Sequence, residues 1–402
     1  MERPVFQPVG TPVEELDTPA LVVDLDVMEA NIARFHTSMD STGDSAGGGS
    51  RIKVRPHVSC HQCPQIAHLQ LAAANPGGGI AVNTVGEAEV FAGAGFNDIL
   101  ISRPVAGRPK IARLCALAQS RRISVVVDDA RHVDSLSAAV SAAGATLGIL
   151  VEVDAGSGGS GVAMGADAAT LAKNVSDAPG LRLDGLMASL PDLSGPDLSG
   201  PDLSGPDLSG PDLSGRRDGP EAPGAVPENE LKARLKELVE TSRLLEQQRA
   251  SAPVVSVAAS GFDDIAGVPG ITEIQVGSYA LMDHAHCLVR PDYSPAAMIL
   301  ASVISHPTEG SAVVDAGHKA TGPDLGLPVL ADSDGAKAVR FSAEHGVLEL
   351  EPSAYSRFMP GGKVWLVPFD LELSLNQYDY IRAVRKGKLE GFWPIAARGR
   401  FS

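Results

Sequence analysis

The sequence contains few cysteines and too little positive charge to balance its acids. Four cysteines in 402 residues are too few for the disulfide framework of a secreted scaffold, so we expect reduced thiols or metal ligands. The formal net charge is −16, which argues against nucleic acid or an anionic membrane as the main partner, because both bind basic surfaces. A small molecule or another protein remains as the expected partner.

Long apolar runs are missing as well. No window is apolar enough for a membrane span, and Met1 to Pro4 lack the apolar core of a signal peptide. We therefore expect no membrane contact and a cytoplasmic location. The chain is 44% hydrophobic and 20% charged, enough to bury one large core or two ordinary cores.

Short apolar runs alternate with alanine-rich runs of helical spacing through most of the first 283 residues. The apolar runs are nearly continuous, which is typical of parallel strands buried on both faces. Eight such strands alternating with helices predict an α/β fold, a (β/α)8 TIM-like barrel over residues 26–283. The expected strands cover residues 52–54, 79–82, 99–102, 123–127, 147–153, 183–187, 254–258 and 271–276.

Loops and an insert interrupt this pattern. We expect Asp26 to cap the first helix and the Gly- and Ser-rich residues 41–50 to form a flexible loop. Five tandem copies of Pro-Asp-Leu-Ser-Gly fill residues 191–215, within an insert of about 191–227 that we expect to be disordered. A docking tether for a partner is the alternative interpretation. A long charged amphipathic helix is predicted from residue 228 to 249.

The pattern changes after residue 283. Short strand candidates separated by Gly and Pro follow one another without a long helical run. We expect a β-rich domain formed by residues 1–25 and 284–402.

The stretch from Arg55 to Pro64 is the best candidate for a functional site. It lies between an expected strand and an expected helix, at the end of a parallel strand where α/β enzymes place their chemistry. It contains two histidines and two cysteines, and Asp283, His284, His286 and Cys287 form a second group. Either group could offer N and S ligands to zinc. Cys60 and Cys63 fit a redox pair less well, because no thioredoxin-like context surrounds them.

Motifs in order along nearly the whole chain resemble the D-threonine aldolase and D-serine dehydratase-like family. They include Asp17-Thr18-Pro19-Ala20, Arg55-Pro56-His57, Thr84-Val85-Gly86-Glu87-Ala88-Glu89, Val151-Glu152-Val153-Asp154, Gly277-Ser278-Tyr279, Met282-Asp283, Val314-Asp315-Ala316-Gly317 and Asn376-Gln377-Tyr378-Asp379. The resemblance implies an alanine-racemase-like barrel of the fold-type III pyridoxal phosphate (PLP) proteins, a C-terminal β domain and a divalent metal. It also implies a homodimer and lyase activity on D-configured 3-hydroxy amino acids.

The resemblance also assigns site residues. It implies catalytic roles for His57 and His61, and it assigns the cofactor to Arg55, Thr84, Ser260, Gly261 and Tyr279. The family's Schiff-base lysine corresponds to Ser59, and a serine hydroxyl cannot form an imine.

Other positions depart from the family pattern too. Lys53 is a poor substitute for the lysine, about 20 Å away along a regular strand, whereas Lys319 is a possible rescuer if it faces the cavity. An arginine expected in the loop after Asp154 is absent, with Gly159 at its place, and Ser189 stands where an aromatic residue is expected. Only part of the expected phosphate-binding glycine stretch remains, at residues 257–261.

The metal ligands of the family correspond to Asp370 and Glu372. Alternate residues of a strand share a face, so both carboxylates could reach one cation. Two oxygen ligands favour Mg²⁺, Ca²⁺ or Mn²⁺ over zinc. Two exposed acids of an acidic protein are the alternative.

Three functions follow from these observations. The first is a pseudoenzyme that binds an amino-acid-like ligand or a partner without Schiff-base chemistry. The second is a PLP-independent, metal-assisted enzyme that uses His57, His61 and the carboxylate pair. The third is an active PLP- and metal-dependent lyase that uses another lysine. Ser59 favours the first two over the third.

Overall fold

The computed structural model describes residues 7–45, 52–74, 78–156, 159–190, 228–248, 250, 252–259, 264–322, 326–331 and 334–402. It divides into two compact units. The barrel unit consists of Ala33–Leu193, Ala225–Gly277 and Gly399–Ser402, and the β unit consists of the chain up to Ile32 together with Ser278–Arg398. None of the helices in these ranges has the length and apolar character needed to cross a membrane.

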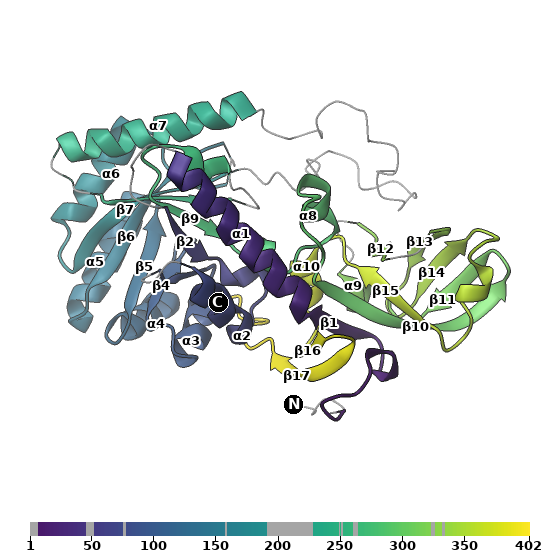
Figure 1. Cartoon of the computed structure of the whole chain (residues 1–402). Helices are drawn as coiled ribbons and strands as arrows, with labels where there is room; N and C mark the ends of the chain where they lie inside the picture. The colour runs from purple at the N-terminus through teal and green to yellow at the C-terminus, as the bar shows by residue number, and fades with distance from the viewer. Residues whose placement is uncertain are drawn as a thin grey trace. The chain divides into compact units, whose positions relative to one another are not determined.

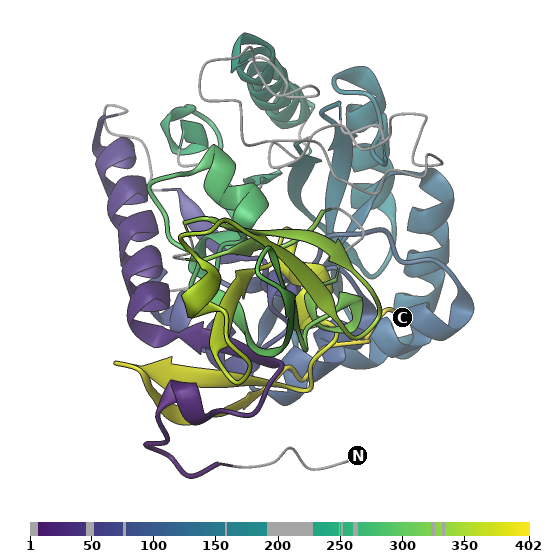
Figure 2. The same ribbon diagram turned by 90° about the vertical axis from the view of Figure 1, so that its right-hand side faces the viewer.

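Eight parallel strands form the sheet of the barrel unit, with helices on its outer side (Figures 1 and 2). The strands are β2 (Lys53–Pro56), β3 (Ile80–Val82), β4 (Asp98–Ile101), β5 (Arg122–Val127), β6 (Leu147–Asp154), β7 (Leu181–Ser189), β8 (Val254–Ala258) and β9 (Glu273–Val276). The helices are α2 (Pro64–Ala73), α3 (Val85–Gly93), α4 (Arg108–Ala118), α5 (Ala130–Ala143), α6 (Ala166–Asp177) and α7 (Glu228–Gln247).

The sheet is nearly a closed barrel. Its strand order is β2-β9-β8-β7-β6-β5-β4-β3, and a single parallel bridge between His57 and Ala81 joins the two outermost strands. The predicted α/β barrel is therefore confirmed. Its interior contains a cluster of buried apolar side chains from five strands: Ala81, Leu100, Val126, Leu150 and Met187.

The β unit is built on a nine-stranded sheet. The strand order is β13-β14-β11-β10-β1-β16-β17, and β15 pairs with both β10 and β12. The pairings are antiparallel except that of β1 with β16. The strands are β1 (Ala20–Asp24), β10 (Ala297–Thr308), β11 (Ser311–Val314), β12 (Val329–Leu330), β13 (Ala336–Phe341), β14 (Gly346–Leu350), β15 (Lys363–Val367), β16 (Tyr380–Arg385) and β17 (Lys388–Pro394).

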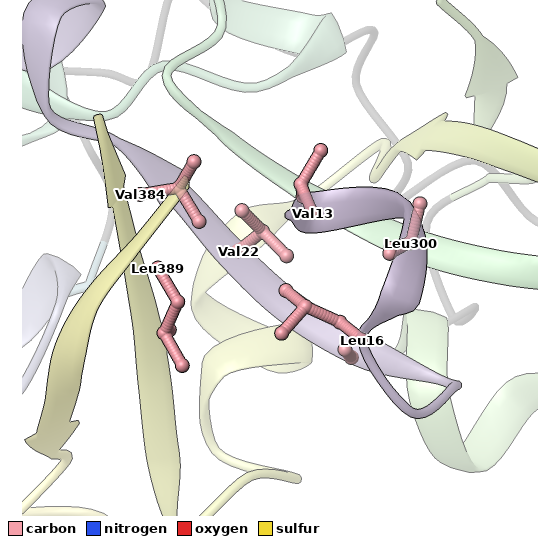
Figure 3. Close-up of a cluster of buried hydrophobic side chains, with 7 residues drawn as sticks. Val13, Leu16, Val22, Leu300, Val384 and Leu389 are labelled. Atoms are coloured by element: carbon pink, nitrogen blue, oxygen red, sulfur yellow. The ribbon is translucent and has the colours of Figure 1, made fainter. Parts of the chain in front are cut away.

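An apolar cluster joins β1 to its neighbours in this sheet (Figure 3). Val22 packs with Leu300 of β10 and Val384 of β16, and Val13 and Leu16 from the segment before β1 cover them. The short helices of the unit are α8 (His284–Val289), α9 (His318–Thr321) and α10 (Leu371–Leu375), with single turns η1 (Val13–Glu15), η4 (Ser278–Ala280) and η5 (Tyr355–Arg357).

Two predictions about the first helix are wrong. Helix α1 (Leu25–Ser45) begins after Asp24, whose Oδ1 accepts the N–H groups of Asp26 at 2.9 Å and Val27 at 3.2 Å, so Asp24 rather than Asp26 is the cap. The helix also continues through Ser45, so residues 41–45 of the expected loop at 41–50 are helical, and Ser41 Oγ donates a hydrogen bond to Ser38 O at 2.8 Å. Residues 46–50 of that loop lie outside the described residues. The Pro-Asp-Leu-Ser-Gly repeats lie outside the described residues.

Candidate active site

Arg55 lies on β2 between two acids of neighbouring strands. Its Nη1 donates a hydrogen bond to Asp98 Oδ1 of β4 at 2.8 Å, and its Nε lies 3.0 Å from Glu273 Oε1 of β9. Burial acts to lower the pKa of Arg55, but the two carboxylates raise it above its usual value. The structure thus assigns the Arg55 guanidinium to ion pairs that join three strands.

His57 follows β2 at the carboxyl-terminal mouth of the barrel. Its Nε2 lies 2.9 Å from Ser102 Oγ, and the Ser102 hydroxyl is within reach of two acceptors, Val82 O and Asn83 Oδ1, both at 3.1 Å. The Ser102 hydroxyl has one proton to donate. When this proton goes to Val82 O or Asn83 Oδ1, His57 Nε2 is the donor to Ser102, and the roles of the two ring nitrogens depend on this tautomer. Burial, with Arg103 nearby, lowers the pKa of His57 to about 4. His57 is therefore neutral at physiological pH.

Ser59 forms a closed hydrogen-bond network with the start of α3. Its hydroxyl donates to Glu87 Oε2 at 2.9 Å and accepts the Asn83 N–H at 3.0 Å. The same carboxylate oxygen accepts the N–H groups of Asn83 at 2.7 Å and Thr84 at 3.2 Å, and Thr84 Oγ1 accepts the Glu87 N–H at 3.1 Å, which completes a capping box. Burial raises the pKa of Glu87. Ser59 thus belongs to the helix cap.

Thr84 has a further contact at this end of α3. Its hydroxyl donates to the carbonyl of Arg400, and a Cβ on Gly86 would lie 2.5 Å from the Ser402 carbonyl oxygen. Residues 399–402 therefore pack against the first turn of α3, and Thr84, which the resemblance assigned to the cofactor, bonds to the chain itself.

His61 is enclosed by hydrogen bonds of its own loop and helix. Its Nδ1 accepts the Cys63 N–H at 3.1 Å, its Nε2 lies 2.9 Å from Gln70 Oε1, and Gln70 Nε2 donates to Gly277 O at 3.1 Å. Burial lowers the pKa of His61 to about 4, although the bond to Gln70 opposes this shift. Both ring nitrogens are used, which leaves His61 no free nitrogen for a metal or a substrate proton.

Two buried polar residues of the barrel were missed at the sequence level. Glu152 on β6 is 1% exposed, and Ser160 Oγ donates to its Oε1 at 2.8 Å. Gln275 on β9 is also 1% exposed, and its Nε2 donates to Ser256 Oγ at 2.8 Å. Each side chain has one oxygen without a hydrogen-bond partner among the described residues. The available signal was a charged or amide residue inside an otherwise apolar strand.

The resemblance assigns three further residues to the cofactor, Ser260, Gly261 and Tyr279. Ser260 and Gly261 lie outside the described residues. Tyr279 is buried in η4 of the β unit.

The predicted metal ligands lie on a helix, so the expectation of a strand there is wrong. Asp370 is the N-cap of α10, where its Oδ1 accepts the Leu373 N–H at 3.1 Å, and Glu372 is an exposed residue of the first turn. Burial raises the pKa of Asp370, and the Asp283 carboxylate adds to this shift. The carboxylate pair stays a prediction.

The second His/Cys group also has a structural role. Asp283 caps α8, with its Oδ1 2.7 Å from His286 Nδ1, and its Oδ2 accepts the Leu371 N–H of α10 at 3.0 Å. Within the ranges that the structure describes, no three His, Cys, Asp or Glu side chains are grouped so that they could hold a metal ion.

Within the barrel unit, every lysine lies on the surface. All five are exposed, four of them on helices α4, α6 and α7, and Lys53 is the first residue of β2, at the opposite end from the mouth. They are Lys53, Lys110, Lys173, Lys232 and Lys236. In the β unit, Lys319 is exposed and forms an ion pair with Glu344.

Comparisons with known proteins agree with this architecture. Residues 23–284 match the alanine racemase N-terminal domain, and residues 296–384 match the putative serine dehydratase domain. A D-threonine aldolase from Arthrobacter sp is 31% identical over 98% of this chain and 96% of its own length. A 3-hydroxy-D-aspartate aldolase from Paracoccus denitrificans (strain Pd 1222) is 32% identical over 97% of this chain and 94% of its own.

A solved structure is similar over the whole chain. The crystal structure of D-threonine aldolase from Filomicrobium marinum has a TM-score of 0.82 at 33% identity and covers 98% of this chain and 100% of its own. Together with the barrel and the β unit, these matches show that the chain belongs to the family of D-threonine aldolases and 3-hydroxyaspartate aldolases and dehydratases.

Proposed function

We propose that this chain binds an amino-acid-like small molecule at the mouth of its barrel without Schiff-base chemistry. The observation that carries the proposal is the distribution of lysines, since all five lysines of the barrel unit are exposed and none extends from the carboxyl end of a strand. Chemistry in barrels of this kind takes place at the carboxyl ends of the strands.

The residues of the barrel do not fit a covalently held PLP. PLP is the cofactor that the family implies, and a lysine amine is what holds it in such proteins. The position that corresponds to this lysine carries the hydroxyl of Ser59, which is already bonded to Glu87 and Asn83. The family resemblance also implies an arginine in the loop after Asp154, and Gly159, which has no side chain, stands at that position. We derive no reaction step through PLP for this reason.

The class of ligand follows from the relatives. Those that cover nearly the whole chain act on D-threonine or 3-hydroxy-D-aspartate, as their names state. The barrel mouth keeps a neutral His57 bonded to Ser102, so it retains polar groups for a small polar ligand. We infer that the ligand is a D-3-hydroxy amino acid or a close analogue.

A chemical trapping experiment tests the proposal. The purified full chain is mixed with PLP, reduced with borohydride, digested and examined by mass spectrometry. We expect no stoichiometric pyridoxyl group on any lysine, because none of the barrel lysines faces the mouth. The Filomicrobium marinum D-threonine aldolase serves as the positive control. A stoichiometric adduct on Lys53 or Lys319 would contradict the proposal and favour a lyase that uses another lysine.

A further inference from the structure

We propose that the mouth of the barrel recognises the free primary ammonium group of its ligand through Glu152 Oε2 and Gln275 Oε1. This inference rests on the proposed function, because an amino group bound as an imine would have no ammonium to donate.

Both side chains point into the barrel. Successive residues of a strand face opposite sides, and Glu152 lies two residues after Leu150, a member of the interior cluster. Gln275 bonds to Ser256, which lies between Val254 and Ala258, the two residues of β8 that pack against this cluster. Arg103 acts electrostatically on both Glu152 and His57, which indicates that these two groups lie in the same region of the mouth.

Each side chain offers one unused acceptor. Ser160 donates to Oε1 of Glu152. Oε2 is buried and has no hydrogen bond within 3.5 Å among the described residues, although the nearby Ser189 hydroxyl acts to lower the pKa of this carboxylate. The Ser256 hydroxyl donates to Glu273 Oε1 at 2.9 Å, so it receives its second bond from the amide nitrogen of Gln275. The Gln275 oxygen is then the atom that faces away from Ser256, and it has no partner in the described part of the chain.

Two buried acceptors require a donor. A buried acceptor without a donor destabilises the folded protein, and a charged acceptor does so more strongly. An ammonium group carries three donors and a positive charge, so it can satisfy a carboxylate and an amide oxygen together. A phosphate or carboxylate group offers these oxygens no donor, so this position suits the ammonium end of the ligand and not its carboxylate.

Arg103 does not replace such a ligand. It is exposed, and no ion pair joins it to Glu152 in the described residues, although its charge lowers the pKa of Glu152 against the larger effect of burial. The loop beside Glu152 also leaves room, because a Cβ on Gly159 would have no heavy atom within 4 Å. The cation that balances Glu152 can therefore come from outside the chain.

Calorimetric titration of the full chain tests the proposal, with D-threonine as the probe. We expect D-threonine to bind at least about tenfold more tightly than 3-hydroxybutanoate of the same configuration at the hydroxyl carbon, which lacks only the amino group. Glu152→Gln should weaken D-threonine binding by at least about tenfold, since it replaces the charged acceptor. Glu349→Gln, at an exposed position of β14, is the matched control and should leave binding unchanged.

A second variant covers the case in which Glu152→Gln does not fold. Gly159→Arg adds a guanidinium where the structure leaves space, and we expect this internal cation to compete with the ligand and weaken its binding. Equal affinities for D-threonine and 3-hydroxybutanoate, or no D-threonine binding at millimolar concentration, would overturn the inference. Absence of D-threonine binding would also contradict the ligand class of the proposed function. Equal affinities together with no borohydride adduct would overturn this inference alone.

Discussion

At the scale of single residues, Ser59 changes the role expected for the stretch from Arg55 to Pro64. Ser59 occupies the position of a nucleophilic amine in the resembled family, but its hydroxyl is part of the cap of α3. It is buried with Glu87, and both of its hydrogen-bonding roles, donor and acceptor, are used. The residue therefore stabilises the loop between β2 and α2 against the start of α3.

Ser59→Ala should lower the free energy of unfolding by about 1–2 kcal/mol, because the buried Glu87 carboxylate loses one donor and Asn83 loses an acceptor. Urea unfolding followed by circular dichroism measures this change. Ser135→Ala, at an exposed position of α5, is the control and should have little effect. Equal stability of Ser59→Ala and the parent chain would show that the network contributes nothing.

At the scale of elements, the strands were easier to predict than the caps. Continuous apolar runs identify β4, β5 and β6 to within a residue or two, since burial on both faces leaves a clear signal. The cap of α1 and the helix α10 were missed, because Asp24 and Asp370 are recognisable as caps only when the direction of the following backbone is known. The contact between the first turn of α3 and residues 399–402 can be tested by substitution.

Gly86→Ala should destabilise the protein or displace residues 399–402, because the added Cβ would lie 2.5 Å from the Ser402 carbonyl oxygen. Gly93→Ala in the same helix is the matched control, as its Cβ would meet no heavy atom within 4 Å. The control should leave stability unchanged or raise it by up to about 1 kcal/mol through helix propensity. Thermal unfolding midpoints of the two variants compare them, and a harmless Gly86→Ala would contradict the contact.

At the scale of the whole molecule, each unit has its own sheet and its own apolar cluster. Buried histidines make the stability of the barrel unit depend on pH. His61 is neutral and buried with a pKa of about 4, below its usual value near 6.5. Below pH 6.5 the unfolded chain binds a proton that the folded chain does not, so the stability falls as the pH falls towards 4.

We expect His61→Asn to reduce this loss, by up to about 3 kcal/mol at pH 4. The substitution keeps an acceptor for the Cys63 N–H, and urea unfolding at several pH values between 7 and 4 measures the slope. His345→Asn, at an exposed position of the β unit, should leave the slope of the parent chain unchanged. A His61→Asn slope equal to that of the parent would show that this histidine is not held neutral.

The sequence by itself determined the barrel, the β-rich remainder and the absence of an amine at position 59, because periodicity and residue identity are local properties. Only the tertiary structure decided that Ser59 and His61 are enclosed by hydrogen bonds and that Glu152 and Gln275 face the barrel interior with an unused oxygen each. The partners of Ser59, Glu152 and Gln275 come from other strands, loops and helices of the barrel, and those of His61 depend on how its loop folds onto α2, so the spacing of residues along the chain does not reveal them.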